Sequence, residues 1–496
     1  MAAGRGRGQA AGRTPTSFDA RQRAFGERLG HRSIADLSTG TLVVVPSITF
    51  PAVELAKITA AQFYEERMLF TLLLLAHPQL RLVYVTSVAV DPEIVEYYLR
   101  FLPDPAGARE RLELVSLDDP VPRSLSEKLL DRPDALASIR SLVPDPDDAC
   151  VLTFNVTTLE RDVCAAMELP LYGTPPELAW LGSKSGARQV ARRAGVAVLD
   201  GAEDLHSVDA LDAAVAVIRS RRPSADAVVV KLNNGFSGQG SAIVTLDGSE
   251  LPITSATTMF CAGEESWASY APKVEDEGAI VEEMVRVPGT RSPSVQLHVS
   301  PAGSFEVVST HDQLLGGPAN QVYLGCRFPA DPAYRLAIQE EALKVAAVLA
   351  TEGVVGSFGI DFLVVPGRRE APVVLSEINL RMGGTTHPFW MARLATGGSY
   401  DQATGQLVAD GRPKFYVATD NFKSPALVGT APARMIERID AAGLGYDPAM
   451  RTGTTLHLLG ALPGYGKVGA TCIADTPEEA DDLYRRVTEV VLGPPA

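Results

Sequence analysis

The chain of 496 residues lacks the marks of several protein classes. Its five cysteines are scattered without a CxxC pair, which argues against a disulfide framework and favours reduced thiols in the cytoplasm. No apolar run approaches the roughly 18 residues of a membrane span, so no membrane partner is expected. Lys and Arg number 45 against 60 Asp and Glu, a net charge of −15. Because phosphate backbones require clustered basic side chains, no nucleic-acid partner is expected.

Two familiar kinds of catalytic motif are also missing. No GxGxxG sequence follows any of the early apolar segments, so no dinucleotide site is predicted there. Neither a Ser/His/Asp set nor a Cys/His set stands out as a nucleophile with its base. The length and a hydrophobic content of 46% instead predict a multidomain protein with large cores.

Apolar strands alternate with helical segments in the first third of the chain. This order is typical of a parallel sheet with right-handed crossovers, which we assign to residues 41–172. A long helix is predicted from Pro51 to Leu75, and its charged cluster, Tyr64 to Arg67, is interpreted as a solvated face or an internal ion pair. The Gly- and Arg-rich N-terminus is expected to be a disordered tail over residues 1–40.

Polar residues alternate at the end of an apolar strand late in the chain. Glu377, Asn379 and Arg381 are spaced two residues apart, so a strand places all three on one face. Another carboxylate, Asp361, lies in the preceding apolar segment, and we expect the two segments to form one antiparallel hairpin. Mg²⁺ takes oxygen ligands and is usually shared between carboxylates and phosphates. Asp361, Glu377 and Asn379 are therefore predicted metal ligands; the alternative is two unrelated polar strand ends.

A lysine followed by a glycine-rich loop is the second site signal. Residues 227–232 form an apolar strand that contains Lys231, and Gly235, Gly238 and Gly240 follow. Backbone N–H groups of such a loop can converge on phosphate oxygens, and the lysine supplies positive charge. The segment is not a P-loop, because the lysine precedes the loop and a strand follows it. The alternative is an ordinary hairpin.

Lys184 opens a predicted helix that Ser183 caps and that ends near Gly195. A cation is disfavoured at a helix N-terminus, and a bound phosphate would account for this one. Taken alone, Lys184 is more often a solvated surface lysine.

Asp361 followed by the Glu377-x-Asn379 pattern resembles the magnesium site of ATP-grasp ligases. The run EINLRMGGTTHP from Glu377 to Pro388 is most similar to the peptide ligases of the pheganomycin type, and the resemblance extends over roughly residues 42–491. It implies an α/β and α+β chain, with a parallel-sheet pre-ATP-grasp domain before a two-lobed ATP-grasp fold. The implied parts are the pre-ATP-grasp domain at 41–172, a lid subdomain at 173–285 and a C-terminal subdomain with the metal site at 286–496.

The resemblance also implies roles for single residues. The implied ATP contacts are Lys184, Lys231, the loop residues Gly235, Ser237, Gly238 and Gly240, and an adenine hinge of Glu282, Glu283, Met284 and Val285. Many family members carry an arginine two positions before the first metal carboxylate. Because Gly359 stands there, Arg381 is expected to contact the substrate carboxylate or the transferred phosphoryl group, and Arg381 and Lys231 are the predicted catalytic residues. The other predicted substrate contacts are Gly383, Arg291 and His311, although a lone histidine is more often structural.

The implied activity is an ATP-dependent carboxylate–amine ligase. ATP phosphorylates a carboxylate, and an amine then attacks the acyl phosphate to give an amide bond, ADP and phosphate. The expected cofactors are ATP and Mg²⁺, with Mn²⁺ as a substitute. The expected partners are an amino-acid-like acid, the amine of an amino acid or peptide, and a second copy of the chain in a homodimer. The resemblance places the reaction in peptide natural-product biosynthesis.

Two alternatives stay open. The first is an ATP-grasp enzyme with a different acceptor, such as bicarbonate or a thiol. The second is a non-catalytic nucleotide-binding regulatory protein, against which the presence of Asp361, Glu377, Asn379 and both lysines argues.

Overall fold

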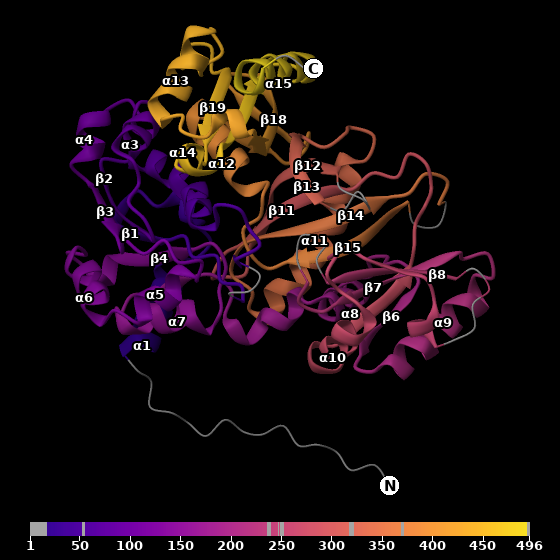
Figure 1. The fold of residues 1–496 in the computed structure, drawn as a ribbon. Coiled ribbons are helices and arrows are strands. Elements are labelled where there is room, and N and C mark those ends of the chain that lie inside the picture. The colour runs from indigo at the N-terminus through magenta and orange to yellow at the C-terminus, as the bar shows by residue number, and fades with distance from the viewer. Residues whose placement is uncertain are drawn as a thin grey trace.

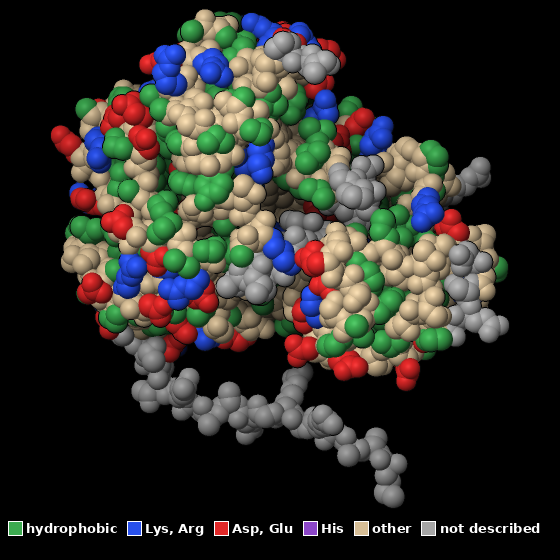
Figure 2. All heavy atoms as spheres, in the orientation of Figure 1, with side chains coloured by type: hydrophobic (Ala, Val, Ile, Leu, Met, Phe, Trp, Pro, Cys, Tyr) green, Lys and Arg blue, Asp and Glu red, His purple; other side chains and the backbone are tan. Residues whose placement is uncertain are grey.

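A computed structural model of the chain describes residues 17–51, 55–235, 240–246, 248, 252–316, 322–368 and 372–493. Figure 1 shows three parts around a common centre: an indigo-to-purple part at the left, a magenta part at the lower right and an orange-to-yellow part above. On the face drawn in Figure 2, the described basic and acidic side chains are interspersed. None of the helices in the described ranges is long and apolar enough to cross a membrane.

The first part is built on a parallel sheet in the order β3-β2-β1-β4-β5, as predicted. β1 is apolar without alternation because both of its faces are covered: Leu42 and Val44 pack into one core, and Val43 and Val45 into another. The strands are β1 (Thr39–Val45), β2 (Gln79–Thr86), β3 (Leu112–Ser116), β4 (Ala149–Thr153) and β5 (Leu171–Tyr172).

Helices cover both faces of this sheet. Ser124 with Glu127 and Thr157 with Glu160 form capping boxes that start α5 and α7. The helices are α1 (Ser17–Leu29), η1 (Ile34–Asp36), η2 (Ala61–Ala76), α3 (Pro92–Leu99), α4 (Pro105–Arg109), α5 (Leu125–Leu130), α6 (Pro133–Ser141), η3 (Pro146–Asp148) and α7 (Thr158–Ala166).

Two expectations for the first part were wrong. The predicted disordered tail does not reach residue 40, because α1 begins at Ser17 and buries Phe25 and Leu29 in the core. The predicted helix from Pro51 is instead a 3₁₀ segment, η2, that starts at Ala61. Most of η2 is buried, so packing from several sides fixes it rather than an amphipathic period.

The second part is an antiparallel sheet in the order β6-β10-β7-β8-β9 with its own apolar core. Ser183 caps α8 as predicted, because its hydroxyl accepts a hydrogen bond from the N–H of Gly186 at 3.0 Å. The elements are η4 (Pro176–Gly182), α8 (Lys184–Arg193), β6 (Gly201–Leu205), α9 (Val208–Arg221), β7 (Ala227–Leu232), β8 (Ser241–Thr245), η5 (Ile253–Ser255), β9 (Thr258–Phe260), α10 (Trp267–Glu277) and β10 (Ala279–Glu283).

The third part is a large sheet in the order β15-β14-β11-β12-β13-β18-β17-β16, with β20 on β18 and β19 on β20. The sequence predicts an irregular segment from Asn320 to Phe328 that rims the site, but residues 322–328 form strand β13, which pairs with β12 and β18. Its strands are β11 (Pro293–Val299), β12 (Phe305–Gly316), β13 (Val322–Phe328), β14 (Gly356–Val364), β15 (Val373–Asn379), β16 (Ser399–Asp401), β17 (Gln406–Ala409), β18 (Arg412–Lys423), β19 (Gly453–His457) and β20 (Lys467–Ala474).

The first and third parts share one continuous core. The ring of Phe70 on η2 stacks on Trp390 of α12 at 6.3 Å, and the hydroxyl of Tyr98 donates to the carbonyl of Leu456 at 3.3 Å. The helices of the third part are α11 (Arg335–Glu352), α12 (Thr386–Thr396), η6 (Pro425–Leu427), α13 (Pro432–Ala441), α14 (Ala461–Tyr465) and α15 (Pro477–Leu492).

Candidate active site

The predicted hairpin forms between β14 and β15, and it places Asp361 directly opposite Glu377. The amide of Asn379 donates to Oδ2 of Asp361 at 3.2 Å, and Nη2 of Arg381 donates to Oδ1 of Asn379 at 3.1 Å. All four side chains line one cavity of about 320 Å³. The alternation read from the sequence therefore produces a shared polar face.

Lys184 and Lys231 reach this hairpin from the second part. Nζ of Lys184, in the first turn of α8, lies 2.5 Å from Oε1 of Glu377. Lys231, on β7, pairs with Glu282 on β10, and the charge of Glu377 also contributes to raising its pKa against the effect of burial. Two lysines distant in sequence thus lie near Glu377, Lys184 in direct contact and Lys231 close enough to be affected by its charge.

The two facing carboxylates differ in how readily they ionise. Burial, followed by the charge of Glu377, raises the pKa of Asp361 to about 6. Burial also favours a raised pKa for Glu377, but Lys184 outweighs it and lowers that pKa. One face thus carries two carboxylates and an amide oxygen, and one of the carboxylates resists ionisation. Such a set of donors suits a hard divalent cation. The residues therefore fit the predicted magnesium.

The predicted adenine hinge is part of the second sheet. The N–H of Glu283 donates to Asp200 and that of Met284 donates to Ala227, so both are used within the sheet. Among the residues that the structure describes, the N–H of Val285 has no hydrogen-bond acceptor. It is the hinge donor left for a base edge.

The side chains of the hinge already have protein partners. The carboxylate of Glu282 pairs with Lys231 and lies 3.4 Å from Arg188, and Glu283 pairs with Arg222 and Arg368. Met284 packs on the apolar cluster of Ala227, Val229 and Ile243 and is not among the residues that line the cavity. Glu282 therefore contacts Lys231 directly, and both hinge carboxylates are engaged in ion pairs.

The glycine-rich loop is described only at its two ends. A Cβ on Gly240, which has φ +78°, would lie 3.2 Å from Cα of Gly235, so the ends are close together. Ser237 and Gly238, which were predicted to contact phosphate, lie outside the described residues.

The predicted substrate contacts separate into two groups. Gly383 and Arg381 line the cavity. Arg291 is exposed, bridges to Val364 and is not among the cavity-lining residues, so the structure does not support a substrate contact there. The expectation for His311 was wrong: the side chain is fully buried, its Nε2 lies 2.6 Å from the hydroxyl of Tyr416, and burial lowers its pKa to about 3.

Sequence reasoning missed several residues of the same cavity. Gln296, on β11, fills the space beside Gly359, where a Cβ would come within 2.7 Å of its amide. Tyr323, by contrast, belongs to the segment expected to rim the site, and its ring lies where a Cβ on Gly384 would be. Arg67 and Asp420, from η2 and β18, line the cavity as well. For Arg67 the sequence signal was the charged Tyr64–Arg67 cluster in an apolar segment.

Comparison with known proteins identifies the family. The chain is 32% identical over 467 residues to the L-propargylglycine--L-glutamate ligase of Streptantibioticus cattleyicolor, covering 92% of this chain and 94% of that protein. The chain belongs to the ATP-grasp carboxylate–amine ligases. Within this ATP-grasp ligase, residues 249–402 match a family model described as IQCH-like, ATP-grasp, and residues 434–487 match one described as PGM1 C-terminal domain.

A more distant relative of the ligase is the IQ motif-containing protein H of Danio rerio, which is 21% identical over 84% of this chain and 45% of its own length. Solved structures share the ATP-grasp fold. Biotin carboxylase from Campylobacter jejuni has a TM-score of 0.56 at 15% identity, with 90% of both chains covered. N5-carboxyaminoimidazole ribonucleotide synthetase from Thermus thermophilus has a TM-score of 0.52 at 15% identity, covering 92% of this chain and 99% of that one.

A third structure is the biotin carboxylase domain dimer of the Hydrogenobacter thermophilus 2-oxoglutarate carboxylase, in complex with MgADP and bicarbonate. It has a TM-score of 0.52 at 13% identity and covers 90% of this chain and 89% of its own. The predicted fold class, a parallel sheet followed by an ATP-grasp fold, is therefore confirmed.

Proposed function

We propose that this ligase joins the carboxylate of an amino-acid-like substrate to the amine of an amino acid or peptide, through an acyl phosphate, with release of ADP and phosphate. The observation that carries the proposal is the Asp361–Glu377 pair facing Lys184, in one cavity with Arg381. The name of the Streptantibioticus relative, a ligase of L-propargylglycine and L-glutamate, supports two amino-acid substrates.

The chemistry needs positioning and charge neutralisation more than a protein nucleophile. Asp361, Glu377 and Asn379 would hold Mg²⁺, or Mn²⁺ in its place. When bound, the ion offsets the negative charge of the β- and γ-phosphates. Lys184 and Lys231 would turn from their acidic partners to phosphate oxygens.

Arg381 would hold the substrate carboxylate as its oxygen attacks the γ-phosphorus. Its guanidinium lies beside Asn379, next to the predicted metal ligands. The amine then attacks the acyl carbon, phosphate leaves, and the amine loses a proton. Gln296 and Ser294 line the same cavity as Arg381, and their polar groups would hold both substrates in position for the reaction.

Several finer assignments belong to the same proposal. A role in peptide natural-product biosynthesis rests on the relative alone. A homodimer is supported by the dimeric biotin carboxylase domain, and a cytoplasmic location by five cysteines without a disulfide. The division into parts near residues 172 and 285 is supported by the order of strands in the three sheets.

An ADP-release screen tests the reaction. Pairs of the twenty L-amino acids are supplied with ATP and Mg²⁺, starting with L-glutamate and small apolar amino acids, and products are identified by mass spectrometry. We expect ADP release to depend on both substrates and to yield an amide. Hydroxylamine in place of the amine should trap the acyl phosphate as a hydroxamate. ADP release with bicarbonate or a thiol but with no amine would contradict the proposal.

A further inference from the structure

A second charged cluster, called here the far end, lines the same cavity and comes from η2 and β18 instead of the metal hairpin. There Arg67 of η2 forms an ion pair with Asp420 of β18, and its guanidinium lies 4.2 Å from the ring centre of Tyr64. Asn421 and Tyr323 line the same end. Both members of the ion pair are largely buried, with side-chain exposures of 13% for Arg67 and 4% for Asp420.

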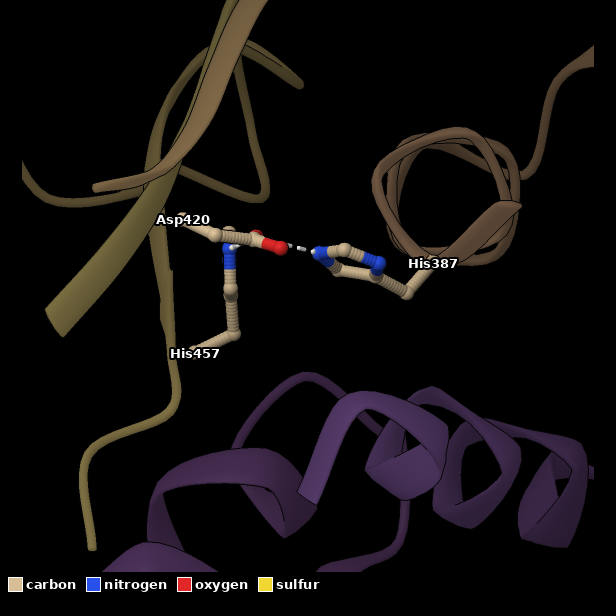
Figure 3. Close-up of side chains that lie close together, drawn as sticks. All are labelled: His387, Asp420 and His457. Atoms are coloured by element: carbon tan, nitrogen blue, oxygen red, sulfur yellow. Dashed lines mark hydrogen bonds and ion pairs between the residues drawn. The ribbon is translucent and has the colours of Figure 1, made fainter. Parts of the chain in front are cut away.

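Asp420 is itself held by two histidines. Oδ1 of Asp420 lies 3.0 Å from Nε2 of His387 and 2.7 Å from Nε2 of His457. Figure 3 shows these three side chains pointing toward one another, His387 from a helix and the other two from strands. The spacing would admit a metal ion. However, both Nε2 atoms hydrogen-bond to the same oxygen of Asp420, and Arg67 contacts the other oxygen. In this pattern the histidines hold the carboxylate that in turn holds Arg67.

The charges at this end do not cancel. Arg67 and the histidines outweigh burial and keep the pKa of Asp420 well below its usual value, so Asp420 is an anion. Burial lowers the pKa of His387 to about 4, so His387 is neutral at pH 7. Lys467 adds a second cation, 4.8 Å from the ring centre of Tyr64. Two cations against one carboxylate leave an excess of at least one positive charge.

Several N–H donors of Arg67 have no hydrogen-bond acceptor among the described residues. Its hydrogen bonds to the described residues use Nη2 alone, although a guanidinium offers five N–H groups. Burial lowers the pKa of Arg381, and the charge of Arg67 adds to that effect, so the two guanidinium groups repel each other. An anion bound between or beside them would relieve this repulsion and use the spare donors.

We propose that Arg67 binds the free carboxylate of the amino-acid acceptor and that Asp420, supported by His387 and His457, positions it. This inference rests on the proposed ligase reaction. The carboxylate that reacts must lie beside Asp361 and Glu377, where Arg381 is the nearest guanidinium. A free α-carboxylate on the amine substrate needs a separate partner, and Arg67 is the guanidinium at the other end of the same cavity.

Apolar residues that line the same cavity indicate which side chain the acceptor carries. Ile48, Phe50 and Ile58 line the cavity with apolar surface. An acceptor held at its carboxylate by Arg67 would lay its side chain on this surface. The structure therefore assigns the acceptor as an α-amino acid with a free carboxylate and an apolar side chain.

Binding without turnover is the first test. Each of the twenty L-amino acids and its amide is titrated into the full-length protein with Mg²⁺ and a non-hydrolysable ATP analogue, by calorimetry. We expect apolar amino acids to bind and their amides to bind about 10- to 100-fold more weakly, because the amide cannot form a charge-assisted pair. Equal binding of acid and amide, or no binding of any apolar amino acid, overturns the proposal.

Arg67→Gln should abolish this preference for the acid over the amide. Because the substitution leaves the buried Asp420 carboxylate without its cation, the Arg67→Gln/Asp420→Asn double variant is tested as well, since it has no buried unpaired charge. Arg67→Lys should recover part of the preference for the acid. The matched control is Arg100→Gln. Arg100 also lies over a tyrosine, at 4.3 Å from the ring of Tyr97, and pairs with Asp440, but it is 37% exposed and outside the cavity lining.

The hydroxylamine assay separates this inference from the proposed reaction. Hydroxamate formation needs no amino-acid acceptor, so Arg67→Gln should leave the KM for the acid within about twofold. If that KM rises while the preference for the free amino acid over its amide is unchanged, Arg67 binds the substrate that is phosphorylated and the proposal is overturned. The two proposals can also fail separately. If no pair of substrates releases ADP, but wild type binds the acid more tightly than the amide and Arg67→Gln does not, the ligase reaction is refuted and the carboxylate site is supported.

Discussion

The two charged ends of the cavity are built differently. At the hairpin end, Lys184 opens α8 and Glu377 lies on β15, two elements of one core, but their ion pair is a single contact to a carboxylate whose side chain is 26% exposed. At the far end, Arg67 and Asp420 come from elements of one shared core, and Asp420 has three cationic or N–H partners. The first arrangement can exchange partners at low structural cost, whereas the second is fixed by folding.

The difference teaches what each end is suited for. A triphosphate must enter and leave on every turnover, so its lysines need partners that can be replaced. A carboxylate that sets substrate identity benefits from a preorganised guanidinium, because less side-chain freedom is lost on binding. Substitutions at the hairpin end should therefore affect activity with little effect on stability, and substitutions at the far end should affect both.

The largest expected effect is that of Glu377→Ala. Removal of this carboxylate takes away a metal ligand and the partner of Lys184, and we expect ADP release to fall by at least about 1000-fold. The melting temperature should change little, because Glu377 is partly exposed. Glu352→Ala is the control, since Glu352 also pairs with a basic residue of α8, Arg193, away from the cavity. Normal turnover by Glu377→Ala would refute the metal site.

Asp420→Asn should be the most damaging change to stability. It leaves the buried guanidinium of Arg67 without its counter-charge, which costs about 3 kcal/mol. Asp440→Asn removes the partner of the exposed Arg100 and should cost less than about 1 kcal/mol. Urea denaturation of both variants measures the difference. Equal losses would mean that the far end is no more fixed than a surface ion pair.

Arg381→Ala should uncouple the reaction. Without its guanidinium the acyl phosphate is held less firmly, so more of it is lost to water before the amine attacks. We expect the ratio of amide formed to ADP released to fall roughly tenfold, with ADP release itself reduced less. Parallel assays of ADP and amide give this ratio. An unchanged ratio with slower ADP release would restrict Arg381 to the phosphoryl transfer step.

Glu66→Gln should have the smallest effect, visible only as a function of pH. Burial raises the pKa of Glu66 to about 8, above its ordinary value near 4.5. The folded protein therefore holds this proton more tightly than the unfolded chain. Its contribution to stability is full below about pH 4.5 and is lost as the pH rises to about 8. At pH 8.5 we expect Glu66→Gln to melt roughly 2 °C higher than the wild type.

At pH 4.5 the same two proteins should melt nearly alike, since Glu66 is then protonated in the folded protein and half protonated in the unfolded chain. The amide can still accept the hydrogen bond that the N–H of Gly460 donates to Glu66 at 3.0 Å. Glu96→Gln, at an exposed acid of α3, is the matched control and should show no pH-dependent gain. A lower melting temperature for Glu66→Gln at pH 8.5 would mean that the folded protein stabilises the Glu66 carboxylate, contrary to a raised pKa.

The hairpin end could be predicted because its signals are local. Asp361 and Glu377 belong to two adjacent strands, and alternation sets which side chains share a face. Lys231 stands beside its glycine-rich loop, and Lys184 opens a capped helix. Each pattern is contained in about twenty residues, so pairing rules were sufficient.

The far end could not be predicted, because its contacts are long-range. Arg67 and Asp420 are 353 residues apart in sequence. Periodicity reports which face of an element is buried, but it does not report which distant element covers that face. The same limit explains the error at His311, whose burial beneath Tyr416 depends on the packing of β12 against β13 and β18.

The contact between Lys184 and Glu377 has a consequence for the order of ligand entry. Because the two groups form an ion pair, each offsets the charge of the other. A triphosphate arriving alone would have to compete with Glu377 for the lysine, and a divalent cation arriving alone would have to compete with Lys184 for the carboxylate. When both arrive as one complex, the lysine can pair with the triphosphate while the carboxylate pairs with the cation, so every charge keeps a partner. The site therefore favours the metal–nucleotide complex over either component alone.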